Sequence, residues 1–204
     1  MSRYSPRARL TNTTSTAAVA NWFGNQFVLI QGNYESIATQ TVGSGGTASV
    51  TFSSIPQTYT HLEIRGLSRL TAAAAYPVLT FNSDSSSANY TLHQTYGNGS
   101  TVSQYATGTG TLGGAYIWYG ATSGEGANVL GPGMLSILDY TNTSKYKTAV
   151  GSSGFNNNGT TTGYLFRSSA LWLNTSAITS ITITAQTGNL AQYSKFALYG
   201  IKSA

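Results

Sequence analysis

Short segments in which apolar and polar residues alternate recur along most of this chain, and Gly, Asn and Ser separate them. Val50 and Phe52 fall on one face of one such segment. In the next, residues 60–66, Leu62 and Ile64 point one way and the polar residues between them point the other way. Alternation with a period of two is typical of strands that are buried on one face only. The pattern therefore predicts a protein built from β-strands.

About ten such segments follow one another, and no stretch reads as an amphipathic helix. The only Ala-rich stretch, residues 71–75, is too short for a stable helix and is expected in a loop. We therefore expect an all-β fold, an antiparallel β-sandwich or jelly roll with an N-terminal extended arm. The expected strands are residues 35–42, 47–52, 60–66, 77–81, 89–96, 115–121, 133–140, 146–154, 163–173, 180–185 and 195–201.

The N-terminal part, residues 1–33, differs from the sandwich domain expected over residues 34–204. Its apolar stretch, residues 22–30, lacks clean alternation and fits either one face of a helix or a buried strand from Phe27 to Ile30. Two roles are open: an N-terminal strand of the same core, or an arm that anchors the protein on a neighbouring subunit. The partner-binding residues expected in such an arm are Arg3, Arg7, Arg9, Trp22, Phe23 and Phe27.

Charged residues make up only 7% of the chain, where roughly 25% is usual. Hydroxyl and amide side chains take their place, and they offer few groups for acid–base or metal chemistry. His61, Glu63 and Arg65 are expected as surface ion pairs, because His93 is the only other histidine available for a metal site. Cysteine is absent, which excludes disulfides and thiolate metal sites. We therefore expect no enzyme, with no catalytic residues, metal or cofactor.

The net charge of +5 is concentrated at the start of the chain, where Arg3, Arg7 and Arg9 lie. The rest of the chain is close to neutral, so it lacks the basic stripe typical of nucleic-acid binding. No stretch resembles a secretory signal or approaches the roughly 20 apolar residues of a membrane span. We therefore expect protein partners, and neither nucleic acid nor membrane.

Tyrosine is abundant, with 14 residues. Several lie in or beside Gly- and Asn-rich segments, and large, stiff aromatic side chains of this kind are enriched in interfaces. Three interpretations are open: the rings fill the core, contact another protein, or stack on sugar rings. The residues expected to make surface contacts are Tyr116, Trp118 and Tyr119; the wider group also holds Tyr90, Tyr96, Tyr105 and Tyr164.

The sequences VTFSSIPQTYTHLEIRG at residues 50–66, ILDYTNTSKYKT at 137–148, LWLNTSAITSITI at 171–183 and QYSKFALYGIK at 192–202 carry a resemblance. Together with the strands between them, they resemble a recurrent module of tailed-bacteriophage virions, especially those of cyanophages. The resemblance covers most of residues 35–202 and says little about residues 1–33. It implies a virion structural protein with a β-sandwich body and no catalytic residues.

From this resemblance we expect a non-enzymatic phage structural protein, made in the host cytoplasm and located in the virion. The leading expectation is a capsid decoration or cement protein. Such a protein would bind the major capsid protein or other virion proteins through its N-terminal arm, as a homo-oligomer for which a trimer suits local three-fold positions. The alternatives are a tail or head fibre module that binds a host receptor or surface glycan, and a minor tail or adaptor protein.

Overall fold

A computed structural model describes residues 32–73, 76–111, 113–116, 118–157 and 163–202, together with the backbone of residues 19–23 and 26–30. Internal contacts divide the chain into two units, residues 1–32 and 33–204. In the first unit, strands β1 (Val19–Phe23) and β2 (Gln26–Ile30) pair in antiparallel register, with Trp22 opposite Phe27. The apolar stretch of the N-terminal part is thus extended in two short strands rather than helical.

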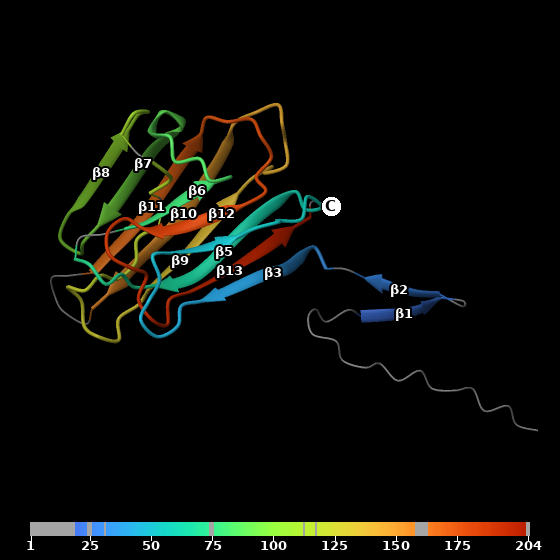
Figure 1. Cartoon of the computed structure of the whole chain (residues 1–204), viewed down its shortest axis with the longest axis horizontal. Coiled ribbons are helices and arrows are strands. Elements are labelled where there is room, and N and C mark those ends of the chain that lie inside the picture. The colour runs from blue at the N-terminus through green and yellow to red at the C-terminus, as the bar shows by residue number, and fades with distance from the viewer. Residues whose placement is uncertain are drawn as a thin grey trace, which may run out of the picture. The chain divides into compact units, whose positions relative to one another are not determined.

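The second unit is dominated by an antiparallel sheet of eight strands (Figure 1). Its order is β3-β13-β5-β9-β10-β11-β7-β8, so the last strand of the chain lies between β3 and β5. The strands are β3 (Tyr34–Thr41), β5 (His61–Ser68), β7 (Tyr90–Gly97), β8 (Val102–Thr107), β9 (Gly131–Ile137), β10 (Lys147–Asn156), β11 (Gly163–Trp172) and β13 (Lys195–Ile201).

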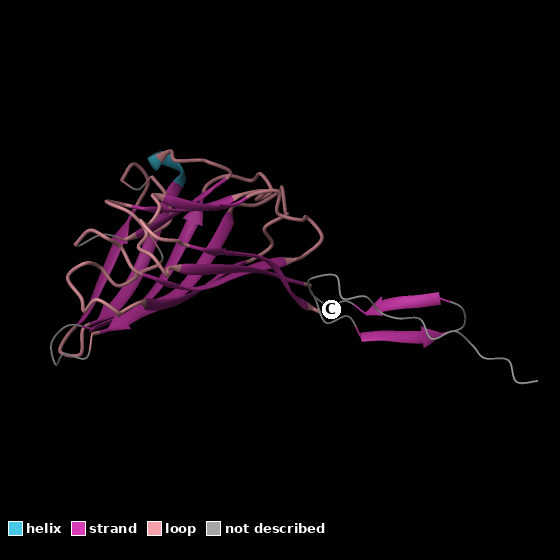
Figure 2. Ribbon diagram, turned by 60° about the horizontal axis from the view of Figure 1, so that its bottom comes forward, coloured by secondary structure: helices cyan, strands magenta, loops and turns pink. Residues whose placement is uncertain are grey.

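A smaller antiparallel sheet has the order β4-β12-β6, with β4 (Ser49–Phe52), β12 (Ile181–Ala185) and β6 (Pro77–Phe81). The only helix in the described residues is the 3-10 turn η1 (Ser87–Asn89) (Figure 2). No helix in the described part of the chain is long and apolar enough to cross a membrane. The structure confirms an all-β fold with two antiparallel sheets, consistent with a β-sandwich, while the jelly roll and the N-terminal extended arm stay predictions.

Side chains from both sheets meet in one hydrophobic core. The alternation in the sequence assigns their faces correctly, because Leu62 and Ile64 are fully buried in the large sheet and Val50 and Phe52 are buried in the small one. The strands of the small sheet are rich in β-branched residues, which suit a pleated surface. One side of the large sheet therefore packs on the core, and its other side carries residues such as the exposed Arg65.

The expectation of a strand at residues 115–121 is wrong, since the described residues of this segment, 115–116 and 118–121, form only two isolated bridges. Ala115 exchanges two backbone hydrogen bonds with Leu79 on β6, and Ala121 pairs with the chain after β5. Between these two anchors Trp118 enters the core, where its indole N–H donates to Ser68 Oγ at 3.0 Å. The segment alternates as a strand does, but its two bridges attach it to different sheets.

Strand β8 was not expected, because its side chains show no apolar alternation. Its burial pattern is exposed or intermediate throughout, and it forms the outer edge of the large sheet beside β7. The strand therefore depends on backbone pairing to β7, over the register Leu92–Thr107 to Gly97–Val102, rather than on a buried face.

Candidate functional site

The side chains on the inner face of the large sheet change from aliphatic near β13 to polar and aromatic near β8. One row of paired residues is aliphatic on β13, β5 and β9, has a glycine on β10, and becomes polar or aromatic on β11, β7 and β8. Its members are Leu198, Ile64, Leu135, Gly151, Ser168, Gln94 and Tyr105. At this second side lies a pocket of about 690 Å³, which we call the aromatic pocket. Its lining is Ala73, Tyr76, Leu92, Gln94, Tyr96, Tyr105, Tyr116, Tyr119, Gly120, Thr122, Gly124, Glu125, Phe155, Tyr164, Phe166 and Gln186.

A pair of stacked rings, which we call the floor, lines the aromatic pocket. Tyr119 and Phe166 are almost parallel, at 4° between planes, and their centroids are 3.5 Å apart. The Tyr119 hydroxyl lies 2.9 Å from Nε2 and 3.1 Å from Oε1 of the buried Gln94. Tyr119 is itself held by its backbone N–H, which donates to Ser153 Oγ at 2.9 Å. The floor is thus rigid and presents one phenol–amide pair.

Further rings surround this floor. Tyr96 stacks on Phe166 at 5.3 Å between centroids, and Tyr164 does so at 5.6 Å. Tyr76 meets the Tyr119 ring edge-on at 4.4 Å. Tyr105, on the edge strand β8, is 45% exposed. Aromatic pairs in these geometries stabilise each other beyond their buried area, so the cluster keeps its shape while its outer rings stay open to a ligand.

A single charged side chain, Glu125, is present among the described residues that line the pocket. It belongs to the loop of residues 122–129, and the Arg69 guanidinium fastens this loop by donating to three backbone carbonyls. The distances are 3.0 Å to the carbonyl of Glu125, 2.8 Å to that of Gly126 and 3.1 Å to that of Val129. Glu125 Oε2 accepts the backbone N–H of Thr122. Arg69 therefore positions the carboxylate from outside the pocket.

Two phenols of the pocket, those of Tyr116 and Tyr119, have a raised pKa and stay protonated around neutral pH. Burial raises the pKa of Tyr119 to about 12; the Gln94 hydrogen bond lowers it in part, and the neighbouring tyrosines add to the rise. Burial also raises the pKa of Tyr116. A protonated phenol both donates and accepts hydrogen bonds. The arrangement is thus suited to stacking and hydrogen bonding, as expected of pockets that are mostly aromatic with a few placed polar groups.

Of the residues expected to make surface contacts, Tyr116 and Tyr119 line the aromatic pocket. Trp118 is a correction, because it is only 1% exposed and packs edge-on against Phe196 in the core at 5.6 Å. Trp118 therefore cannot stack on a ligand at the surface, and of the three interpretations only the core one applies to it. The arm residues Arg3, Arg7 and Arg9 lie outside the described residues, and of Trp22, Phe23 and Phe27 only the backbone is described.

Sequence reasoning missed Gln94, Phe155 and Phe166, because only strand pairing places them beside the tyrosines. It also missed Tyr76 and Glu125, which reach the pocket from loops far away in the chain. One usable signal was present: in GYLFRSSALW at β11, Tyr164 and Phe166 share a face with Ser168 and Ala170, so the aromatic end of that face could have been marked.

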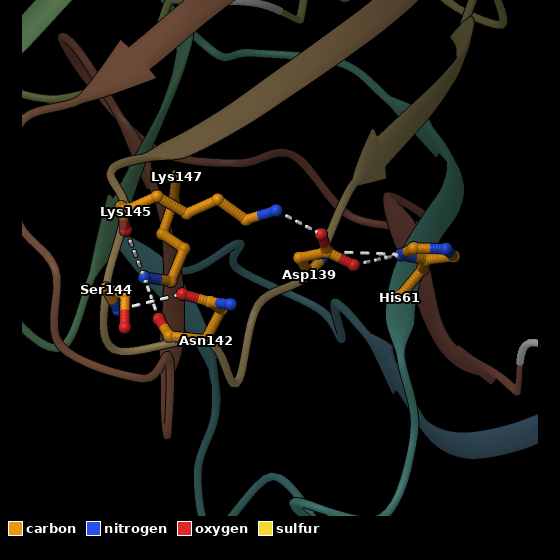
Figure 3. Close-up of polar contacts among 6 residues, drawn as sticks. All are labelled: His61, Asp139, Asn142, Ser144, Lys145 and Lys147. Carbon is orange, nitrogen blue, oxygen red and sulfur yellow. Dashed lines mark hydrogen bonds and ion pairs between the residues drawn. The ribbon is translucent and has the colours of Figure 1, made fainter.

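The remaining charged residues near the loop that follows β9 serve the fold (Figure 3). Lys147 is buried and its ammonium donates to the carbonyls of Asn142 at 2.5 Å, Lys145 at 2.9 Å and Thr175 at 2.9 Å. His61 Nδ1 accepts the backbone N–H of Asp139 at 3.0 Å, and Lys145 forms an ion pair with the same aspartate. No group of three potential metal ligands occurs in the described part of the chain.

The outer face of the large sheet has a second hollow, of about 1130 Å³, which we call the outer groove. Small residues on neighbouring strands form its base, among them Gly97, Ser152 and Gly154. Met134 and Leu165 also line it and are 43% and 69% exposed. Glu63 lies on the same face as Arg65, which contacts it at 2.5 Å, and Tyr34 donates to that carboxylate at 2.7 Å. The pair forms as expected, although Glu63 is buried.

Comparisons with protein-family models, with curated proteins and with solved structures found no match.

Proposed function

We propose that this chain is a non-enzymatic structural protein of a tailed-bacteriophage virion, with a jelly-roll-like body that binds a host-surface saccharide through the aromatic pocket. The virion part of the proposal rests on the sequence resemblance. The saccharide part rests on one observation, the pocket in which tyrosine and phenylalanine rings surround Gln94 and Glu125. The function is that of a tail or head fibre module.

A pyranose ring offers an apolar face of C–H groups and an edge of hydroxyl groups. The aromatic rings of the pocket match the first requirement, because flat rings bury apolar area at low entropic cost. The amide of Gln94, the phenols and the carboxylate of Glu125 match the second. The floor is already ordered by the Tyr119–Phe166 stack, so little conformational freedom is lost when a ligand binds.

A glycan array followed by isothermal titration calorimetry tests this proposal. Tyr105→Ala should weaken saccharide binding about two- to thirteenfold, the loss expected for one stacking contact of about 0.5–1.5 kcal/mol. Tyr146→Ala is the matched control, because Tyr146 is 50% exposed and lies outside the pocket lining, whereas Tyr105 is 45% exposed within it. Absence of any saccharide hit, or equal loss in both variants, would contradict the proposal.

A capsid decoration or cement protein is the second candidate, and the outer groove favours it. Exposed apolar side chains beside small residues are typical of surfaces that pack on another protein. In this candidate the chain is a homo-oligomer that locks neighbouring capsid subunits, and residues 1–33 anchor it to the shell. A minor tail or adaptor protein would share the fold and differ in copy number.

Copy number relative to the major capsid protein, measured in purified virions by quantitative mass spectrometry, separates the two candidates. A ratio near one or a simple fraction of it supports decoration, whereas a few to a few dozen copies support a fibre or tail part. Deletion of residues 1–33 adds a second test, because a folded body that no longer binds particles supports the anchor. Full decoration by the truncated protein would refute the anchoring role.

A further inference from the structure

The described residues that line the aromatic pocket carry negative charge and no positive charge. The faces of its rings carry the negative end of an aromatic quadrupole, and its one charged group among the described residues is the carboxylate of Glu125. No lysine or arginine belongs to the described lining. The nearby cation, Arg69, donates its N–H groups to the backbone carbonyls of the loop. The pocket therefore presents negative potential to whatever enters it.

The geometry of Glu125 leaves half of its carboxylate for a ligand. Oε2 accepts the Thr122 N–H, and Oε1 has no hydrogen-bond partner among the described residues. Arg69 fixes the backbone of the loop that carries Glu125 at three carbonyls. The Thr122 N–H then holds the carboxylate itself through Oε2. A fixed carboxylate beside aromatic faces is the arrangement that attracts ammonium groups, through cation–π contact and charge pairing together.

We infer that Glu125 makes this pocket select saccharides that carry a free ammonium group and reject those that carry a carboxylate. The inference rests on the proposed saccharide binding and adds the charge class of the ligand. Amino sugars gain the cation–π contact and the ion pair. Uronic and sialic acids place a negative charge against Glu125, and no lysine or arginine of the described lining offsets it. Repulsion between Glu125 and an acidic saccharide contributes to this selectivity, together with the attraction of an amino sugar.

The test compares three oligosaccharides of equal length and identical β-1,4 linkage: oligomers of glucosamine, of glucose and of glucuronic acid. They are printed on the same array as other neutral, amino and acidic glycans, and the hits are titrated below the pKa of the sugar ammonium. For the full-length protein we expect the amino series to bind at least about tenfold more tightly than the acidic series. The preference should shrink at high salt, because screening weakens exposed charge pairs.

Glu125→Gln is the decisive variant, since its amide oxygen can still accept the Thr122 N–H while the charge is gone. It should bring the amino and acidic series to within about threefold of each other. Asp139→Asn is the matched control, because it removes one negative charge outside the pocket lining; it should leave the preference intact. Thermal unfolding of both variants checks that the fold is retained.

Each remaining outcome has a meaning. Equal or tighter binding of the acidic series by the wild-type protein overturns the charge selectivity while the saccharide function stands. A preference that survives in Glu125→Gln also overturns the role of this residue. Absence of binding to any glycan on the array contradicts the proposed function itself, and the selectivity falls with it.

Discussion

At the scale of single residues, two glycines owe their place to an aromatic ring that covers them. A Cβ added to Gly133 would lie 2.4 Å from Cε2 of Trp118, and one added to Gly200 would lie 2.4 Å from the Tyr59 ring. Real Cβ atoms do not come this close to a ring, so both positions require glycine for space rather than for backbone freedom. The Tyr59 hydroxyl then donates to Glu35 at 2.9 Å, which ties the same ring to β3.

Substitution of Gly133 by Ala should destabilise the sandwich by about 1–3 kcal/mol, because the added methyl forces Trp118 out of its packed position. Chemical denaturation measured by tryptophan fluorescence gives the change in free energy of unfolding. Gly108→Ala is the control, since nothing lies within 4 Å of an added Cβ there. Equal stability of the two variants would mean that the core accommodates the methyl.

Asp84 gives the fold a predicted sensitivity to acid. Burial alone would raise the pKa of this carboxyl, but hydrogen bonds from Trp172, the Ser86 amide and Asn89 outweigh burial and hold the pKa below its usual value. The indole N–H of Trp172 donates at 2.8 Å and the Asn89 amide at 2.7 Å, both to Oδ2. Because the carboxyl has a lower pKa in the folded state than in the unfolded one, its stabilising contribution is present above the unfolded pKa. That contribution is lost as the pH falls through the folded pKa.

Asp84→Asn should therefore cost about 1–2 kcal/mol at neutral pH, where charge-assisted hydrogen bonds are lost. The difference from the wild type should shrink as the pH falls below the unfolded-state pKa of about 4, and it should vanish once the pH is below the lower pKa of the folded carboxyl. Thermal unfolding followed from pH 7 down to acid compares the two proteins. A constant difference in stability at all pH values would show that the carboxylate charge is not what stabilises this contact.

At the scale of elements, the connection between β8 and β9 is bridged to neighbouring chain segments and fills part of the core, although its described residues form no regular strand. Ala115 in this connection is bridged to Leu79 on β6, and Ala121 is bridged to Arg69 after β5. Trp118 between these anchors fills the core, while Tyr116 and Tyr119 line the aromatic pocket. The same connection thus closes the core and forms one wall of the site.

Arg69→Lys should loosen the loop of residues 122–129, because an ammonium cannot match the three carbonyl contacts of the guanidinium fork. Hydrogen–deuterium exchange should become faster for amides in this loop and stay unchanged in β10 and β11. If the proposed function holds, the affinity for saccharide should fall about two- to fivefold, with the ring cluster intact. Unchanged loop exchange would contradict the positioning role of Arg69.

At the scale of the whole molecule, the chain divides into residues 1–32 and residues 33–204. The hydrophobic core, both larger sheets and the aromatic pocket all belong to the second unit. A body with its own core is expected to unfold as one cooperative unit without the rest of the chain. The N-terminal unit contributes the paired strands β1 and β2.

Deletion of residues 1–32 should therefore leave the midpoint of thermal unfolding within about 2 °C of the full-length value. Differential scanning calorimetry on the two proteins, with circular dichroism for the strand content, makes the comparison. A midpoint lower by much more than this, or a body that aggregates, would show that the N-terminal strands stabilise the sandwich. This result also bears on the particle-binding test. If the truncated protein keeps its fold, a loss of particle binding can be attributed to the missing anchor and not to unfolding.

The sequence alone determined which segments become strands and which of their faces are buried. Leu62 and Ile64 illustrate why, since period-two alternation is local information that survives without knowledge of the partner strand. It failed at β8, whose strand character comes from pairing with β7, and at residues 115–121, whose bridges lead to two different sheets.

Only the tertiary structure decided which tyrosines could form a site. Tyr116, Trp118 and Tyr119 are neighbours in sequence, yet Trp118 is in the core while the two tyrosines line the pocket. The local sequence pattern cannot separate these three residues, because their positions depend on distant neighbours. Gly133 leaves room for the Trp118 ring, and Phe166 stacks on the Tyr119 ring. The pocket unites residues from β7, β8, β10 and β11 with three distant loops, and strand order is a long-range property set by how both sheets share one core.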